Sequence, residues 1–378
     1  MIVHLIDNLF PESGGPTTVV LEFARYQAMH GRQVAVVARK AGRNEEARER
    51  LARHWSGTGV RFIDLSEQSA PTLEQAIDSM RVEVLHVHCV WEPLVRTGCR
   101  LARRRSIPYV LSTHGMLHPF ALQQKWLKKS VYMRVFPWIL RSANELFALN
   151  REEATYAGQR FRRPCSVLPN GINVNDYAKV DAAPFFEAFP ELEGHPYILF
   201  VGRLHPIKGI DKLIRSYALC KRQGLPHRLA IVGPEECFLK EAQSTAREVG
   251  VAEHVHFLGG IFGPLKLSAY AGCSIFAHRP RFEGFGITVV EALASAKPVV
   301  TTCECKLDGA AGANAMLVAD DTDEAFAEGL LQCWRRPDEA RQMGERGQAW
   351  VKETLDWEAL ARQADRSYAA ARTSRGTT

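Results

Sequence analysis

The 378-residue sequence has no uninterrupted apolar run of the roughly 20 residues that a helix needs to cross a bilayer. Its first residues, Met1 to His4, lack the basic start of a secretory signal peptide, so we expect a cytoplasmic protein. The nine cysteines are scattered, and their one close pair, Cys303 and Cys305, has no second pair at zinc-site spacing. The sequence therefore predicts neither a disulfide framework nor a bound metal.

The phosphate-binding fingerprints of two large enzyme classes are also missing. No Gly-x-Gly-x-x-Gly follows a predicted strand, which argues against a dinucleotide-dependent oxidoreductase, and no Gly-Lys-Ser/Thr follows a glycine loop, which argues against a P-loop nucleotide hydrolase. The net charge is only +6, without the dense basic stripe that nucleic acid requires. We expect no nucleic-acid partner, because this mild charge suits phosphate-bearing small molecules or an anionic membrane surface.

The chain does contain short β-branched runs that alternate with helical patterns. Five runs in the first half predict strands buried on both faces, at 2–7, 34–39, 84–88, 109–113 and 145–149. After the proline-containing segment 176–196 a second series begins, at 197–203, 228–233, 254–259, 274–278 and 298–302. This alternation predicts the α/β class, with parallel sheets covered by helices.

The length favours two domains over one. We predict an N-terminal domain at residues 1–180 and a C-terminal domain at 190–355, with a helix at 356–372 that crosses back to the first. Ligands of open α/β folds bind at the carboxyl ends of the strands, so we expect the site between the two domains.

Two features of the first half are candidates for that site. The first strand leads into Ser13-Gly14-Gly15-Pro16, a glycine turn that opens a helix and offers backbone N–H groups to an anion; a plain tight turn is the alternative. His114 follows the strand 109–113 at a carboxyl edge, which favours a site role over a structural one.

The second half supplies charged candidates. Arg203 and Lys208 lie five residues apart in the loop after a strand. A planar guanidinium and a mobile ammonium together suit the charge on a departing nucleoside diphosphate, whereas solvated loop cations are the alternative.

Residues 281–293 begin as a glycine-rich loop and continue as a helix. Glu283 falls in the loop and Glu291 inside the helix, so the two carboxylates can hold different hydroxyls of one elongated ligand. The backbone N–H groups of Phe285, Gly286 and Ile287 are placed to meet its phosphates. Two solvated surface glutamates are the alternative.

The motifs Gly-Arg-Leu-x-x-x-Lys-Gly at 202–209 and Glu-Gly-Phe-Gly-x-x-x-x-Glu-Ala at 283–292, in this order, resemble the retaining glycosyltransferases of family 4, group 1. The resemblance covers nearly the whole chain and implies the GT-B fold, in which two Rossmann-like, doubly wound domains face each other across a cleft. Two departures stand out: Ala296 replaces a frequent glycine, and the cations of 278–281 either reach phosphate or only coat the loop.

The resemblance implies a role for each matching residue. Arg203 and Lys208 match residues that bind the donor diphosphate, Glu283 matches the one that holds donor-sugar hydroxyls, and Glu291 matches the one that holds the ribose. Gly14 and Gly15 match glycines that close over the diphosphate, and His114 matches a histidine at the reacting centre. The catalytic candidates are therefore His114, Arg203, Lys208 and Glu283, and the donor-binding candidates add Gly14, Gly15, Phe285, Gly286, Ile287 and Glu291. Separately, we expect the nucleobase to rest on the segment 259–263, with Ile261 as the candidate residue.

The implied reaction moves a hexose from a UDP-sugar or GDP-sugar to an acceptor with retention of configuration, through front-face attack, with no metal or other cofactor. Competing interpretations are a GT-B nucleotide-sugar epimerase and a catalytically silent nucleotide-sugar-binding protein. The Glu-x7-Glu motif argues against the first, and the presence of all four charged donor ligands argues against the second.

Residues 125–138 mix cations with large apolar residues, including Trp126 and Trp138. This pattern predicts an amphipathic helix on an anionic membrane, and a partly buried helix with a solvated basic face is the alternative. Segments 90–93 and 113–116 also resemble bacterial enzymes that assemble surface polysaccharides or O-antigens on polyprenyl diphosphate. That resemblance implies a lipid-linked saccharide acceptor and a peripheral position on the inner face of the cytoplasmic membrane.

Overall fold

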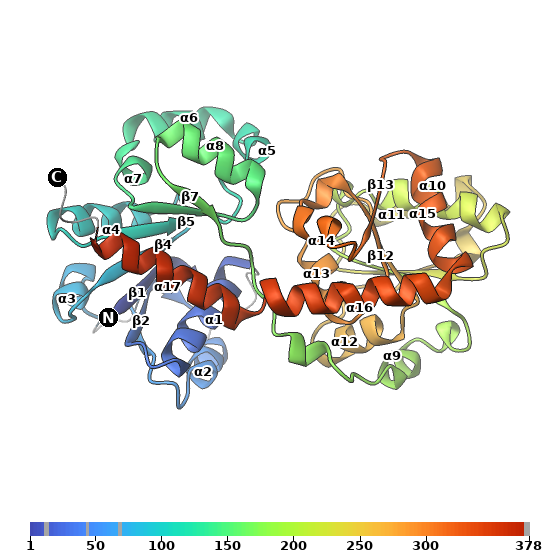
Figure 1. The fold of residues 1–378 in the computed structure, drawn as a ribbon, viewed down its shortest axis with the longest axis horizontal. Helices are drawn as coiled ribbons and strands as arrows, with labels where there is room; N and C mark the ends of the chain where they lie inside the picture. The colour runs from blue at the N-terminus through green and yellow to red at the C-terminus, as the bar shows by residue number, and fades with distance from the viewer. Residues whose placement is uncertain (11–14, 43–44, 67–69, 374–378) are drawn as a thin grey trace. The chain divides into compact units, whose positions relative to one another are not determined.

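The computed structural model describes residues 1–10, 15–42, 45–66 and 70–373, which form two compact units (Figure 1). The first unit comprises the chain up to Gly171 together with the segment from Trp357 onward, and the second is Ile172–Asp356. Residues 172–180, placed with the first domain by the sequence, thus belong to the second unit. The reason is that the 3-10 helix η2 (Val174–Tyr177) packs on helices of that unit, with the Tyr177 ring 6.3 Å from the ring of Tyr270.

The first unit is built on a seven-stranded sheet of order β3-β2-β1-β4-β5-β6-β7, in which every neighbouring pair is parallel. Its strands are β1 (Ile2–Leu9), β2 (Val34–Ala41), β3 (Arg61–Asp64), β4 (Val84–His88), β5 (Tyr109–Ser112), β6 (Glu145–Ala148) and β7 (Cys165–Val167). Strands buried on both faces form because their runs are almost wholly apolar.

Helices cover both faces of this sheet (Figure 1). The helices are α1 (Gly15–Met29), α2 (Glu45–His54), α3 (Leu73–Asp78), α4 (Pro93–Arg104), α5 (Pro119–Gln123), α6 (Trp126–Val135), α7 (Trp138–Arg141), α8 (Arg151–Phe161) and α17 (Trp357–Thr373). Apolar residues of α1, α2 and α17 pack on one face of the sheet, and those of α3, α4, α7 and α8 pack on the other. Trp357, at the start of α17, contacts Phe23 of α1 edge-to-face at 5.5 Å, so the returning helix completes the core of this unit.

The second unit has a six-stranded sheet of order β10-β9-β8-β11-β12-β13, also parallel throughout. Its strands are β8 (Tyr197–Val201), β9 (Arg228–Val232), β10 (Val255–Phe257), β11 (Ile275–His278), β12 (Val299–Thr302) and β13 (Leu317–Ala319). Its helices are α9 (Ala183–Ala188), α10 (Ile210–Arg222), α11 (Leu239–Glu248), α12 (Gly263–Gly272), α13 (Ile287–Ala294), α14 (Asp308–Gly312), α15 (Asp323–Arg335) and α16 (Pro337–Thr354), with short 3-10 turns at η3 (Pro190–Leu192), η4 (Pro206–Lys208), η5 (Ala252–His254) and η6 (Cys303–Cys305).

Every strand predicted from the sequence is present, with slightly different ends, and the predicted α/β class with doubly wound sheets is confirmed. Three strands were not predicted: β3, β7 and β13, each at the edge of a sheet. They are short and only partly buried, so they lack the continuous apolar run that marks a central strand. Within the described part of the chain, no helix is long and apolar enough to cross a bilayer.

Candidate functional site

In the second unit, the loop after β8 places Lys208 at the carboxyl edge of the sheet. The 3-10 helix η4 ends at Lys208, and Gly209 then turns the chain into α10 with φ +63°, a left-handed conformation that favours glycine. A Cβ on Gly209 would lie 2.0 Å from the backbone oxygen of Arg279, just beyond β11. The loops after β8 and β11 therefore touch backbone to backbone at this glycine.

This close approach brings Lys208 and Glu283 together. The Lys208 ammonium donates to Glu283 Oε2 at 2.6 Å, and Nε2 of His278 donates to the same oxygen at 3.2 Å. Burial by itself would raise the pKa of Glu283, but the hydrogen bond from His278 and the charge of Lys208 outweigh it and lower the pKa to about 2. Glu283 is therefore a carboxylate at neutral pH, with one oxygen held and the other, Oε1, bonded to no described residue.

His278 is a residue whose role the sequence analysis missed. It was grouped with the cations of 278–281, yet its side chain is almost fully buried at the end of β11, where its ring stacks on Phe200 at 5.7 Å. A histidine that ends a buried strand five residues before a motif glutamate is the signal that could have found it.

The neighbouring arginines do more than coat the loop, because both are ion-paired within the second unit. The buried Arg279 donates to Asp321, Asp323 and Ser216, and Arg281 makes a two-pronged contact with Asp211 at 2.6 and 2.7 Å. These bonds tie the loop after β11 to α10 and α15 and hold Glu283 in place.

Arg203 lies in the same loop as Lys208 but does not contact Glu283. Its guanidinium donates to Glu236 Oε1 at 2.6 Å in the loop after β9, and the side chain is 57% exposed. An exposed ion pair of this kind is weak, so Arg203 can turn toward an anion at little cost.

Glu291 lies within α13, as predicted, where it is nearly buried. Lys266 donates to its Oε1 at 2.6 Å and the Tyr270 hydroxyl to its Oε2 at 2.7 Å, and both partners belong to α12. The Tyr177 side chain also hydrogen-bonds to this carboxylate, so side chains of η2 and α12 together fix its position.

The predicted phosphate-binding amides lie at the start of α13. The N–H of Ile287 donates to the backbone oxygen of Phe285 at 2.8 Å, whereas no described residue accepts from the N–H of Phe285 or Gly286. In the loop before α12 the Ile261 side chain is buried and the adjacent Phe262 ring is 73% exposed. Phe262 is thus the residue of this loop whose side chain is available for stacking on a base.

In the first unit, Gly14 lies outside the described residues and Gly15 is the first residue of α1, beyond the carboxyl end of β1. His114 follows β5 in a left-handed conformation, φ +51°. The buried Glu153, at the start of α8, holds this loop by accepting bonds from the Thr113 hydroxyl at 2.7 Å and the Leu117 N–H at 3.0 Å. Glu153 is not among the residues predicted from the sequence, although its position three residues after Asn150, the N-cap of α8, is typical of a helix start.

A cavity of about 660 Å³ adjoins His114. Trp91, Tyr132, Gln124 and Lys128 line it together with His114. Aromatic faces, an amide and a cation are the groups that bind sugars and phosphates, and all of them come from the first unit.

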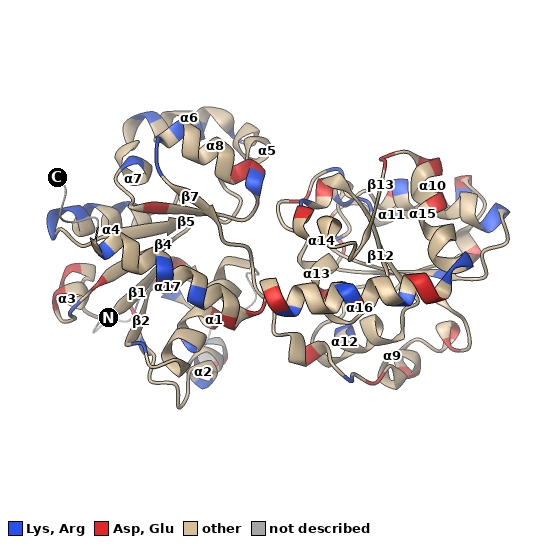
Figure 2. Cartoon of the chain, in the orientation of Figure 1, with Lys and Arg blue, Asp and Glu red and all other residues tan. Residues whose placement is uncertain are grey.

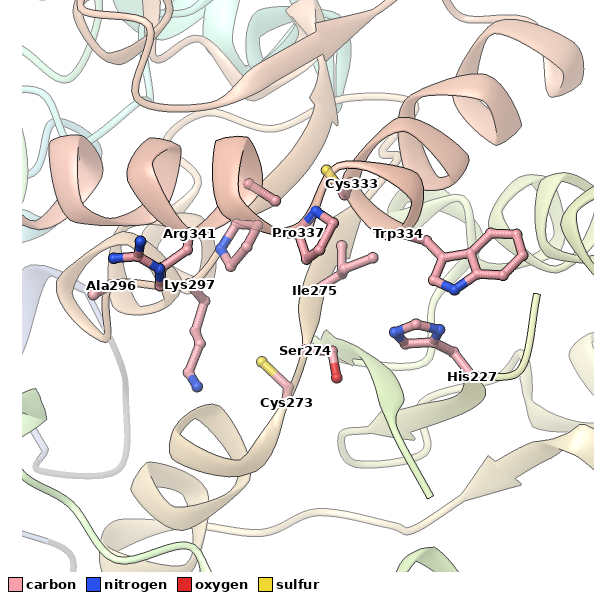
Figure 3. A pocket seen from close by; sticks show the side chains of 12 residues that line it. His227, Cys273, Ser274, Ile275, Ala296, Lys297, Cys333, Trp334, Pro337 and Arg341 are labelled. Atoms are coloured by element: carbon pink, nitrogen blue, oxygen red, sulfur yellow. The ribbon is translucent and has the colours of Figure 1, made fainter. Parts of the chain in front are cut away.

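A second cavity, of about 360 Å³, lies in the second unit at the amino ends of β9, β11 and β12 (Figure 3). His227, Ser274, Lys297 and Trp334 are among its lining residues. None of the predicted site residues lines it, because those residues follow the carboxyl ends of the strands.

Two family models match the chain. The model described as Glycosyl transferases group 1 matches residues 182–350, and that described as Glycosyltransferase Family 4 matches residues 13–176. The two matched ranges correspond closely to the two structural units.

Among curated proteins, the GDP-mannose-dependent alpha-(1-6)-phosphatidylinositol monomannoside mannosyltransferase of Mycolicibacterium smegmatis is 27% identical, over 93% of this chain and 94% of its own. The putative glycosyltransferase EpsD of Bacillus subtilis is also 27% identical, over 73% of this chain and 73% of its own. The solved structure of Anabaena HepE in complex with UDP matches with a TM-score of 0.76 at 19% identity, over 98% of this chain and 99% of that one.

Proposed function

Because the chain belongs to the family 4, group 1 glycosyltransferases and has the GT-B fold, we propose that it moves a sugar from a nucleoside-diphosphate sugar to a hydroxyl of a saccharide acceptor, with retention of the anomeric configuration. The donor is a UDP-sugar or GDP-sugar, and no metal or other cofactor takes part.

The observation that carries this proposal is the pairing of Lys208 with Glu283. A cation for phosphate and an ionised acceptor for hydroxyls lie next to each other, at the ends of two neighbouring strands. In a sugar attached to a diphosphate, the sugar hydroxyls lie next to the charged phosphates, so the two parts of the ligand match the carboxylate and the ammonium of this pair. Oε1 of Glu283 accepts a sugar hydroxyl, while Lys208 and the N–H groups of Phe285 and Gly286 face the diphosphate.

In the proposed reaction, an acceptor hydroxyl attacks C1 of the donor sugar from the face that the diphosphate leaves. The bond from C1 to the phosphate oxygen breaks as the new glycosidic bond forms, and the acceptor proton passes to the departing phosphate oxygen. Arg203 and Lys208 stabilise the charge that develops on the diphosphate, which is catalysis by oriented electrostatics. His114 positions the sugar and the acceptor.

The acceptor is proposed to be a lipid-linked saccharide in surface polysaccharide assembly. The M. smegmatis relative is named for phosphatidylinositol monomannoside as acceptor. Helix α6 of this chain supports a lipid-linked acceptor as well, because it exposes large apolar side chains. Trp126, Leu127 and Val131 are each about 60% exposed. Lys125 precedes this helix, and Lys128 and Arg134 lie within it. Figure 2 shows the basic residues on α6. We propose that this face lies on an anionic membrane beside the cavity at His114.

Nucleoside diphosphates are expected to raise the melting temperature of the purified protein. At about 100 times its Kd a ligand stabilises the folded state by about 2.7 kcal/mol, a shift of several degrees. UDP or GDP should produce the shift with EDTA present, whereas NADH should not. If NADH alone stabilised the protein, or if the shift required a divalent metal, the proposed donor site would be wrong.

Charge reversal of Lys125 and Lys128 to glutamate is expected to weaken binding to phosphatidylglycerol-containing vesicles by about 30-fold or more, because each basic residue near an anionic surface contributes about 1 kcal/mol. Lys129 is not included, since its ammonium donates to the backbone oxygen of Ala121 and lies over the Trp91 ring. Vesicle co-sedimentation measures the effect.

In the matched control, two exposed cations of the second unit, Arg222 and Lys240, are changed to glutamate. This variant should bind vesicles as the wild type does. Equal binding by both variants would remove the membrane from the proposal.

A further inference from the structure

Three histidines occupy one face of the first sheet. His86 and His88 alternate along β4, so their side chains point to the same face, and His4 of β1 is the register partner of His86. All three are fully buried, and the rings of Phe23 of α1 and Tyr368 of α17 lie beside His4 and His86. Polar rings in such an apolar layer are costly unless their nitrogens are hydrogen-bonded.

Each ring nitrogen of the three has a partner. His86 lies 2.6 Å from the Tyr368 hydroxyl and 2.7 Å from the Ser112 hydroxyl. The other contacts form a chain: Gln27 Oε1 to His4 Nε2 at 2.8 Å, His4 Nδ1 to His88 Nε2 at 3.0 Å, and His88 Nδ1 to His114 Nε2 at 3.1 Å. The chain therefore runs from α1 through two strands to the histidine at the cavity.

The orientation of the Gln27 amide determines which nitrogen donates in each of these hydrogen bonds. The amide nitrogen of Gln27 faces the Tyr368 hydroxyl at 3.4 Å and Asp365 Oδ1 at 3.5 Å, and the opposite orientation would set the amide oxygen against a carboxylate. The amide oxygen therefore faces His4, so Nε2 of His4 must donate to it. A neutral imidazole has one proton, which leaves Nδ1 of His4 as an acceptor.

The one-proton limit of a neutral imidazole also fixes the donors at the next two histidines. His88 donates from Nε2 to His4 and must accept at Nδ1, so His114 donates from Nε2 to His88. Neutrality is consistent with burial, which lowers the pKa of His4 and His114 to about 4 and that of His86 and His88 well below the usual value.

We propose that Gln27, His4 and His88 are positioning residues that fix His114 as its Nε2–H tautomer, leaving a lone pair at Nδ1 for a substrate hydroxyl. No described residue bonds to this nitrogen, and His114 lines the cavity of the first unit. The chemical role of the lone pair rests on the proposed function, whereas the tautomer is a property of the free protein.

A transition metal held by His4, His86 and His88 is the competing use of these side chains, since one ligand atom of each lies within 4.8 Å of the others. It would have to replace hydrogen bonds that already satisfy all six nitrogens. Metal analysis of the purified protein, together with the spectra below, decides between the two.

The test is ¹⁵N NMR of the full-length protein labelled with [¹⁵N]histidine, because protonated and unprotonated ring nitrogens have well-separated shifts. The His114→Gln variant assigns the His114 signals. We expect a protonated Nε2 and an unprotonated Nδ1 for His114. A protonated Nδ1, or ring nitrogens bound to metal, would overturn the proposal whether or not the protein transfers sugar.

The His88→Leu variant should leave His114 as a mixture of tautomers and, because the ring also loses the bond that orients it, lower kcat by about 10- to 100-fold, as expected when a substrate-positioning group is misplaced. His88→Asn, which can offer an oxygen near the position of Nδ1, should restore the Nε2–H tautomer and most of the turnover. If His88→Leu fails to fold, Gln27→Leu removes the acceptor at the far end of the chain and should shift the tautomer in the same direction. If these variants were less stable but the His114 spectrum did not change, the hydrogen-bonded side chains would only stabilise the fold, and the proposal would be wrong.

Discussion

Replacing Lys208 with alanine is expected to lower kcat by about 100- to 1,000-fold, the loss typical of removing one preorganised donor from a developing negative charge. The ammonium is positioned by Glu283 at 2.6 Å, and both side chains are about 15% exposed, where water screens their charges little. Glu283→Ala should cause a loss of similar size, because the sugar hydroxyls lose their ionised acceptor. Steady-state kinetics with saturating donor measure both.

Stability should change far less than turnover in these variants, by about 1 to 2 kcal/mol, since neither side chain belongs to a hydrophobic core and only a few hydrogen bonds are lost. Arg341→Ala is the control: Arg341 is also ion-paired, with Glu345, but lies on the exposed side of α16. Its kcat should remain within about twofold of the wild type, the range expected for a surface change away from the site. Near wild-type turnover in both Lys208→Ala and Glu283→Ala would refute the assigned donor site.

Gly209→Ala is expected to lower the free energy of unfolding by about 2 to 4 kcal/mol, because the left-handed backbone is strained for alanine and the new Cβ meets a backbone oxygen. That oxygen belongs to Arg279 and would lie 2.0 Å away. Separating the two loops also moves Lys208 away from Glu283, so kcat should fall together with stability. Thermal and urea unfolding followed by circular dichroism measure the first effect.

Gly224→Ala provides the comparison. Gly224 follows the other end of α10 with φ +84°, and an added Cβ there would have no atom within 4 Å. This variant should show only the cost of the backbone conformation, about 1 kcal/mol, and keep full activity. Equal destabilisation by the two substitutions would mean that the contact with Arg279 does not hold the loops together.

The central strands could be predicted because a strand buried on both faces is mostly apolar, and the places of the charged candidates could be predicted because they follow such strands. Lys208 and Glu283 are examples: each follows a strand of the expected series. The partners of these residues could not be predicted. Nothing local to Arg203 indicates Glu236, and nothing local to Glu291 indicates Lys266, because these pairings depend on which loops the sheet order makes neighbours.

The buried histidines show the same limit. The alternation of His86 and His88 within an apolar strand indicates a shared face, but His4 joins them only through the pairing of β1 with β4. Glu153 was overlooked for a related reason, since an acidic residue at a helix start is usually solvated, whereas this one is buried beneath the His114 loop.

The discontinuity of the first unit has a consequence for how the protein is made. The second unit is one unbroken segment and can fold once Asp356 has left the ribosome, although it is translated after most of the first. The first unit must wait for α17, because Trp357, Leu360 and Tyr368 pack with Phe23 of α1 on the face of the sheet that carries Ile2. Until α17 has been synthesised, this apolar face lacks part of its cover, so a helix translated after the whole second unit decides whether the half translated first becomes a native domain or a substrate for chaperones.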